Sequence, residues 1–391
     1  MSRLLDGVYS GLTVLFTPSR ARAPRRLQNP QRILVIKPCC FGDLVMATVA
    51  LAALARAYPQ AEIRLAVGAW SRPAVAGNPR LAGLVDSDPV GTASIRQTWR
   101  AYLRLARQLR AGRPDAVLVL DRSPVLGLLA WLTGARVRAG LDSGGRGFAL
   151  THRVPCPPDA ARHEVAWYLD VVRALGVPAD PATRLEFAPT PDDEAEATTL
   201  LTELGLYLTQ RRLVALHTGG GSNPGMRLAA KRWAPDRWAA VLTRLLAADP
   251  AAQVLLLGGP GAEDRTAADA IWAALPPEAQ SRVHDAVGRL GWGALAATIR
   301  RCRLFLGPDT GALHLAVAVG TPVVAVFGPS DPRRYGPWDP GGPSRAVGGT
   351  ATGVDLAARA TALADVSFHT SVDVDAVWAA VQDVWSDLSV G

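Results

Sequence analysis

Cysteine and long apolar runs are both scarce in this sequence. Its 391 residues include four cysteines, Cys39, Cys40, Cys156 and Cys302, which are too few and too scattered for a disulfide framework. The adjacent Cys39 and Cys40 are expected to be poor partners for each other. No apolar run reaches the roughly 20 residues of a membrane-spanning helix, and the N-terminus lacks the cleavage site of a secretory signal. We therefore expect a reducing, cytoplasmic compartment.

Metal and dinucleotide motifs are also missing. The sequence has no CxxC pair and no HExxH motif, so no structural zinc site is predicted. Two Asp-x-Asp strings occur, at 86–88 and 373–375, but neither lies at a turn that is expected to carry chemistry. The turn at 257–263 is not GxGxxG, which argues against a dinucleotide oxidoreductase.

Lysine is almost absent although basic residues are plentiful. Among the 42 lysines and arginines, only Lys37 and Lys231 are lysines. Because arginine serves elsewhere, a persisting lysine is a candidate for a position that needs a compact ammonium group; chance is the alternative. The net charge of +8 favours anionic partners such as phosphates, nucleotides, nucleic acid or a membrane surface.

Size and periodicity predict two domains. At about 150 residues per domain the length suits two, or three, units, and the 49% of apolar residues can form a real core. Apolar segments with the strand period alternate with helical ones, which indicates parallel sheets covered on both faces. Strands are expected at 32–37, 62–67, 116–120, 213–216, 253–257, 303–306 and 322–327, and helices at 44–58, 95–109, 124–133, 163–175, 236–247, 262–274, 293–301, 310–319 and 374–388.

The predicted fold class is α/β, with two Rossmann-like domains facing across a cleft. The boundary is placed in the proline-containing segment 177–191, because proline cannot donate to a strand ladder and stiffens an extended chain. This gives an N-terminal extension at 1–30, a first domain at 31–190, a second at 191–370 and a C-terminal helix at 371–391.

The N-terminal extension combines an apolar helical pattern with a basic cluster. An interfacial helix on an anionic membrane would have this composition, and an ordinary helix packed on the body is the equal alternative. The apolar residues are Leu4, Leu5, Val8, Tyr9, Leu12, Leu15 and Phe16, and the arginines that follow are Arg20, Arg22, Arg25 and Arg26.

Two turns at predicted strand ends carry candidate residues for acid-base and anion chemistry. In the turn after strand 32–37, Asp43 could take a proton from a hydroxyl or could simply cap the next helix. After strand 213–216, Thr218 and Gly219 belong to a glycine-rich loop whose N–H groups can face an anion. Lys231 could reach a phosphate from the far end of that loop, unless the loop and its basic pair are merely exposed.

Two later turns add further candidates. Glu263, after strand 253–257, could accept from ribose hydroxyls or could favour the helix dipole as a first-turn carboxylate. After strand 303–306, the amides of Thr310 and Gly311 begin a helix and suit a diphosphate. Asp309 and His314 flank them; capping and core packing are their respective alternatives, and we favour a functional group of all four.

Together these pieces resemble glycosyltransferase family 9, the ADP-heptose heptosyltransferases of lipopolysaccharide core assembly. The likeness runs from about residue 32 to the C-terminal helix. It rests on the segments Gly42-Asp43, Lys231-Arg232-Trp233, Gly258-Gly259-Pro260, Asp309-Thr310-Gly311 with His314 and Leu315, and 320–330.

The resemblance implies a GT-B fold and a metal-independent, inverting transfer from a nucleotide sugar, with no cofactor. It assigns the catalytic base to Asp43, the donor phosphate contact to Lys231 and the diphosphate loop to 309–311, with Glu263 as a ribose contact. The first domain would then hold the acceptor and the second the nucleotide sugar.

The sequence departs from the family at the acceptor side. Cys39, Cys40 and Phe41 stand where the family usually has small hydroxyl residues. The expected partners are a nucleotide sugar, an ADP-sugar by resemblance, and a glycan or lipid-linked acceptor, with no nucleic acid. The rival readings are a non-catalytic nucleotide-sugar binding protein and a GT-B-like nucleotide-sugar epimerase.

Overall fold

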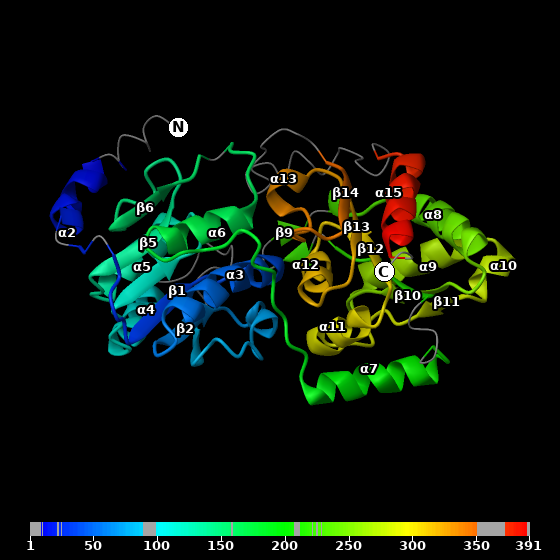
Figure 1. The fold of residues 1–391 in the computed structure, drawn as a ribbon, viewed down its shortest axis with the longest axis horizontal. Coiled ribbons are helices and arrows are strands. Elements are labelled where there is room, and N and C mark those ends of the chain that lie inside the picture. The colour runs from blue at the N-terminus through cyan, green and yellow to red at the C-terminus, as the bar shows by residue number, and fades with distance from the viewer. Residues whose placement is uncertain are drawn as a thin grey trace. The chain divides into compact units, whose positions relative to one another are not determined.

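The computed structural model describes residues 9, 11–21, 23–24, 26–88, 99–157, 159–206, 212–220, 222–223, 226–227, 229–349 and 372–388. The chain divides into two compact units, Met1–Thr183 and Arg184–Gly391. Figure 1 shows them in blue to green and in green to red. The division falls inside the proline-containing segment, slightly ahead of the boundary expected after residue 190.

Unit 1 is built on a parallel six-stranded sheet. The strand order is β3-β2-β1-β4-β5-β6, which is the doubly wound Rossmann order. The strands are β1 (Arg32–Ile36), β2 (Glu62–Val67), β3 (Gly83–Asp86), β4 (Ala116–Val119), β5 (Val137–Asp142) and β6 (His152–Pro155). β1 and β4 are apolar and almost fully buried, because helices cover both faces of the sheet.

The helices of unit 1 pack in pairs. α3 (Phe41–Ala57) contacts α6 (Glu164–Arg173), and α4 (Trp99–Ala111) contacts α5 (Pro124–Leu132). α3 has a run of fully buried residues through Leu54, as an apolar helix between sheet and neighbour requires. A short 3-10 turn, η1 (Arg72–Ala74), and α2 (Thr17–Ala21) complete the unit.

Unit 2 repeats the same strand order. Its parallel sheet runs β11-β10-β7-β12-β13-β14, so β7 and β12 occupy the places of β1 and β4. The strands are β7 (Leu213–His217), β10 (Gln253–Leu257), β11 (Val283–Asp285), β12 (Leu304–Pro308), β13 (Val323–Phe327) and β14 (Arg345–Gly348), and β8 (Ser222–Asn223) pairs with β9 (Met226–Arg227) as an antiparallel ribbon.

Helices surround this second sheet. They are α7 (Pro191–Glu203), α8 (Pro235–Ala248), α9 (Ala262–Ala274), α10 (Pro277–Gln280), α11 (Trp292–Arg300), α12 (Gly311–Ala318), α13 (Pro332–Tyr335) and α15 (Val374–Asp387), with η3 (Ala229–Lys231). α15 packs on α8, β13 and β14. It buries Val377, Val381 and Val384 in the core of unit 2, so the C-terminal helix belongs to that unit.

The N-terminal extension contacts unit 1. Tyr9 stacks on Phe148 with ring centroids 6.1 Å apart, and Phe16 meets the edge of Trp131 at 5.4 Å. This is the packing expected of a helix docked on the body, although Val14 and Leu15 remain exposed. None of the helices in the described part of the chain is both long enough and apolar enough to cross a membrane.

One strand glycine of unit 1 has no space for a side chain. A Cβ on Gly140 in β5 would lie 2.8 Å from the Val119 carbonyl oxygen of β4, whereas a Cβ on Gly83 in β3 would meet nothing within 4 Å. Gly140→Ala should lower the free energy of unfolding by about 1–3 kcal/mol, because the clashing atom is backbone. Gly83→Ala is the control and should change it by less than about 0.5 kcal/mol. Equal urea midpoints for the two variants would contradict this reading.

Candidate active site

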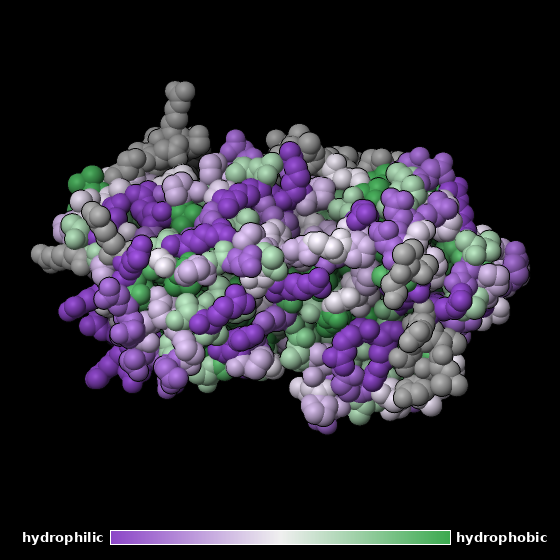
Figure 2. Space-filling view, in the orientation of Figure 1, coloured by the Kyte–Doolittle hydropathy of each residue, from purple (hydrophilic) through white to green (hydrophobic). Residues whose placement is uncertain are grey.

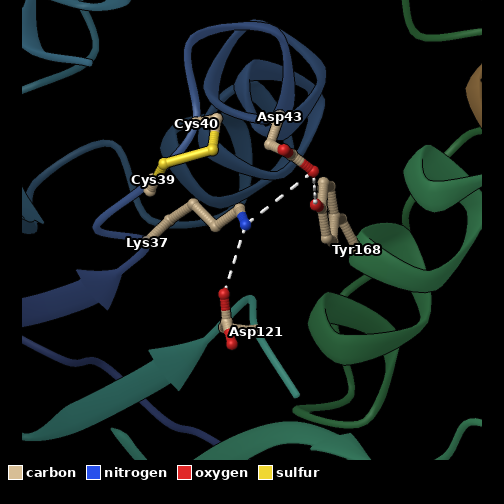
Figure 3. Close-up of a disulfide and its surroundings, with 6 residues drawn as sticks. All are labelled: Lys37, Cys39, Cys40, Asp43, Asp121 and Tyr168. Atoms are coloured by element: carbon tan, nitrogen blue, oxygen red, sulfur yellow. Dashed lines mark hydrogen bonds and ion pairs between the residues drawn. A yellow bond between two sulfur atoms is a disulfide. The ribbon is translucent and has the colours of Figure 1, made fainter. Parts of the chain in front are cut away.

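The first cluster lies where β1 and β4 end. Lys37 follows β1 and is buried, and its ammonium lies 3.3 Å from an oxygen of Asp121, which comes shortly after β4. The same ammonium is 3.8 Å from Oδ1 of Asp43 in the first turn of α3. The Tyr168 hydroxyl on α6 donates to that Oδ1 at 3.3 Å. Figure 3 shows these four side chains, which we call the unit 1 cluster.

Charge stabilises this arrangement. Burial by itself would lower the pKa of Lys37, but the carboxylates of Asp43, Asp121 and Glu164 raise it above its ordinary value. Burial and the nearby Asp43 and Glu164 carboxylates raise the pKa of Tyr168 well above its ordinary range. The lysine is therefore charged and the tyrosine is a neutral donor at physiological pH.

Asp43 keeps one side free for chemistry. Both of the contacts described for its carboxylate use Oδ1, and its side chain is 29% exposed. The helix cap of α3 is Cys40, so Asp43 is not the cap that the alternative reading required. A carboxylate held on one oxygen and open on the other can accept a proton from a hydroxyl.

An ion pair connects two of the elements that carry the unit 1 cluster. Arg122, next to Asp121, donates to both oxygens of Glu164 at 2.9 Å. Glu164 is buried in the first turn of α6, the helix that carries Tyr168. The Arg122 Nε also donates to Cys156 Sγ at 3.3 Å. This pair fixes the end of β4 to α6, and so fixes Asp121 relative to Tyr168.

Cys39 and Cys40 form a disulfide, which corrects the expectation that they would be poor partners. The peptide bond between them is cis, and their Cα atoms are 3.1 Å apart. The expectation rested only on their being adjacent; across a trans peptide bond neighbouring Cα atoms are about 3.8 Å apart. Cys156 and Cys302 are buried and form no disulfide.

The second cluster lies in unit 2, where β12 ends. Lys231, at the end of η3, donates to Asp309 at 2.6 Å, and the Ser330 hydroxyl donates to the same carboxylate. Burial would raise the pKa of Asp309, but the Lys231 ammonium and these hydrogen bonds bring it below its ordinary value. Asp309 is therefore an ionised partner of Lys231. The cap of α12 is Thr310, not Asp309. We call Lys231, Asp309, Thr310 and Ser330 the unit 2 cluster.

A glycine in the loop after β7 allows that loop to pack closely against the start of α12. A Cβ on Gly220, whose φ is +142°, would lie 2.5 Å from Thr310 Cγ2, so the loop after β7 lies against the helix start. The Thr310 hydroxyl is buried and makes no hydrogen bond within the described structure. Gly311 opens the helix, and His314 is buried one turn further on. First-turn amides with a positive helix end form an anion site.

Arg232 joins the remaining candidates. It donates to the Gly220 carbonyl at 3.0 Å, to Glu263 Oε2 at 3.3 Å and to Asp264 Oδ1 at 2.7 Å. Asp264 also accepts from the Gly259 N–H at 2.7 Å. The Thr218 hydroxyl donates to the carbonyls of Leu257 and Asp264.

Gly219 completes this network. A Cβ there would lie 2.1 Å from the Asp264 carboxylate, so a larger residue would have to displace the side chain that holds Arg232 and Gly259. Glu263 occupies the first turn of α9, as its alternative reading expected, and its side chain is also an arginine partner.

Comparison with known proteins identifies the family. The pattern of glycosyltransferase family 9 (heptosyltransferase) matches residues 102–342. The chain belongs to glycosyltransferase family 9. It is 27% identical over 310 residues to lipopolysaccharide heptosyltransferase 2 of Escherichia coli K12, covering 77% of this chain and 84% of the relative. It is also 27% identical over 312 residues to an Escherichia coli lipopolysaccharide heptosyltransferase 3, covering 76% and 83%.

Solved structures share the fold. A family 9 glycosyltransferase from Veillonella parvula covers 94% of this chain with a TM-score of 0.76 at 21% identity, and all of that chain is matched. The Escherichia coli ADP-heptose heptosyltransferase II covers 92% with a TM-score of 0.67 at 22% identity, and 99% of that chain is matched. These findings confirm the predicted family, the glycosyltransferase class and the α/β, GT-B type fold.

The structure brings most of the predicted site residues close together, but the sequence analysis did not predict the residues that they contact. Lys231, Asp309, Thr310, Gly311 and His314 come together at α12, and Arg232 links Thr218, Gly219 and Glu263 to them through the loop after β7. The missed residues are Asp121, Tyr168, Arg122, Glu164, Asp264 and Ser330, and Arg232 was noted only as part of the segment Lys231-Arg232-Trp233, without a role. Asp121 had a signal, since it follows a buried strand as closely as Asp309 does.

The Asp-x-Asp strings have structural roles. Asp88 accepts from the Ala69 N–H at 2.7 Å, and Asp373 caps α15. Within the described residues, no group of three or more His, Cys, Asp or Glu side chains is arranged to hold a metal ion.

Asp264 should be a structural support of the loop after β7. Asp264→Ala removes the acceptor for Gly259 and Arg232, and an unpaired buried donor costs about 1–3 kcal/mol. Asp269→Ala on the same helix is the control, because that side chain is 64% exposed. Chemical denaturation should show a clear loss for Asp264→Ala alone; matching losses would mean that the network is not what stabilises the loop.

Proposed function

We propose that the enzyme transfers a heptose-like sugar from an ADP-sugar to a hydroxyl of a glycan or glycolipid in cell-envelope glycan biosynthesis, without a metal and with inversion. The observation that carries this proposal is the Asp43 carboxylate, which lies 3.8 Å from the Lys37 ammonium through Oδ1 and is 29% exposed. The named activity of the curated relatives supports the heptose, and the resemblance to ADP-heptose enzymes supports the ADP-sugar.

Acceptor activation falls to Asp43. The acceptor oxygen forms a bond to the anomeric carbon, the bond from that carbon to the phosphate oxygen breaks, and the acceptor proton passes to Asp43. The nucleoside diphosphate leaves with the bonding electrons. Attack from the side opposite the leaving group inverts the anomeric centre. Lys37 and Tyr168 hold the carboxylate in place through its Oδ1.

Leaving-group stabilisation falls to the unit 2 cluster. Negative charge grows on the departing diphosphate, and Lys231 with the positive end of α12 supplies positive charge for it. Asp309 orients the Lys231 ammonium at 2.6 Å. We propose metal independence because this cation and helix end suffice for the role that a divalent ion would otherwise play.

Three functions are separated by one set of measurements. We expect ADP-sugars, rather than UDP- or GDP-sugars, to raise the melting temperature, because a ligand that binds the native state stabilises it. ADP release that depends on an added acceptor supports the transferase. Binding without turnover favours the nucleotide-sugar binding protein. Conversion of the donor sugar with no acceptor favours the epimerase.

Asp43→Ala should abolish transfer and preserve donor binding. Loss of a positioned base typically lowers kcat by about 100- to 10,000-fold, while the diphosphate contacts lie in unit 2. Asp86→Ala is the control, because its carboxylate is exposed in unit 1. Turnover of Asp43→Ala within about threefold of wild type would remove Asp43 from the mechanism.

Lys231→Arg should not be conservative. A planar guanidinium cannot take the place of an ammonium held 2.6 Å from Asp309 without moving the phosphate. We expect kcat/KM to fall by about tenfold or more, as for the loss of one good charged contact. Arg289→Lys, at an exposed ion pair of the same unit, is the charge-preserving control. Full activity of Lys231→Arg would show that this position needs a cation but not an ammonium group.

We also propose a location. The enzyme works in the cytoplasm, at the inner face of the cell membrane, where a lipid-linked acceptor is presented. The basic balance of the chain and the apolar and basic N-terminal extension support this placement.

A further inference from the structure

We propose that α4, α5 and the neighbouring N-terminal segment of unit 1 form a docking surface for an anionic lipid bilayer. We call the exposed side chains of Val14, Leu15, Leu103, Val125, Leu128 and Trp131, with the arginines of α4, the docking surface. The inference deepens the proposed function, on which it rests, by naming the surface that would meet the membrane.

The apolar part of this surface is centred on α5. Val125, Leu128 and Trp131 recur at helical spacing, and each is between 36% and 42% exposed. The opposite face of the same helix places Leu126 and Leu129 in the core. A helix of nine residues thus buries one apolar face and presents a second one to solvent, which is unusual for a surface helix.

The apolar surface continues onto the N-terminal segment. Phe16 packs against the edge of Trp131. Val14 and Leu15, which precede Phe16 in the sequence, are 70% and 73% exposed, so two further apolar side chains face solvent next to a residue that contacts α5. On the other side, α4 packs on α5 and presents Leu103.

Arginines border these apolar residues. Arg104, Arg107 and Arg110 are exposed on α4, and the Arg110 guanidinium lies about 4.0 Å from a Cβ built on Gly134, just beyond α5. Figure 2 shows hydrophilic side chains gathered over α4. The amphipathic sequence of α4 places Leu105 and Leu109 in the core and the arginines outside.

Acidic residues are missing from all three segments. No aspartate or glutamate occurs at 7–42, 89–114 or 122–141. The charged side chains that these three segments contribute to the docking surface are therefore all positive. An anionic bilayer complements both features, because arginines reach the headgroups while apolar side chains and a tryptophan enter the interface.

The docking surface also adjoins the unit 1 cluster. α5 begins directly after Asp121-Arg122-Ser123, and Asp121 binds Lys37. A bilayer against α5 would therefore lie next to the turn that holds the proposed base partner, which suits an acceptor anchored in lipid.

Vesicle co-sedimentation of the full-length protein tests the proposal. We expect binding to vesicles of equal parts phosphatidylcholine and phosphatidylglycerol, a decrease as salt rises, and little binding to phosphatidylcholine alone. Val125→Gln with Leu128→Gln should weaken binding by about tenfold. Arg104→Gln with Arg107→Gln should weaken it by about 30-fold, since each arginine near the surface contributes about 1 kcal/mol.

Matched controls stand in unit 2. Trp272→Gln removes an exposed tryptophan and Arg289→Gln an exposed arginine, and both should bind like wild type. Unchanged melting temperatures would show that the docking variants fold. Wild-type binding by both docking variants, equal losses in the controls, or equal binding to phosphatidylcholine alone would overturn the proposal. The proposal would also be overturned if this surface instead bound a soluble protein, in a complex that Val125→Gln with Leu128→Gln abolishes.

The two proposals can fail separately. Donor-induced thermal shifts and ADP release with a soluble acceptor do not need the docking surface, so the docking variants should retain both. Vesicle binding without any nucleotide-sugar response would refute the proposed function and leave the docking surface in place. A protein that responds to nucleotide sugars but does not bind anionic vesicles would refute the docking surface and leave the proposed function in place.

Discussion

A largely buried lysine-aspartate pair, with one fully buried partner, organises each unit. Lys37 and Lys231, the two lysines of the chain, each meet an aspartate that comes directly after or shortly after the fourth strand of a Rossmann sheet, Asp121 after β4 and Asp309 after β12. An unpaired charge at such depth would be strongly unfavourable. Each pair therefore joins the chain near strand one to the end of strand four, at the point where the strand order reverses and ligands bind in this fold.

The sequence predicted those elements whose signals are local. The bounds of β2, β10 and α9 agree with the expected ranges, because a single apolar pattern ends at a clear turn or cap in each case. β3, β5, β6, β11 and β14 were not predicted. They are short or lie toward sheet edges, so burial there depends on neighbours far away in the chain. α7 was missed although Thr190 and Asp193 form a capping box, a local signal that could have found it.

Site residues followed the same division. Asp43, Lys231 and the start of α12 were predicted from turns at strand ends. Tyr168 and Asp121 were not, because their places beside Lys37 depend on helix packing and strand order rather than on spacing. Cys39 and Cys40 were expected to be poor partners because they are adjacent, and the structure corrects this with a disulfide between them.

The charges of the two clusters differ in a way that suits two different roles. The unit 1 cluster sets one ammonium against two carboxylates, so it has an excess negative charge and a carboxylate oxygen open to a proton. The unit 2 cluster balances one ammonium with one carboxylate, and the positive end of α12 then tips it toward anions. One sheet topology thus suits the two proposed roles, a proton acceptor in unit 1 and a diphosphate site in unit 2. The difference comes from a single additional aspartate, Asp43, placed in the first turn of the helix after strand one.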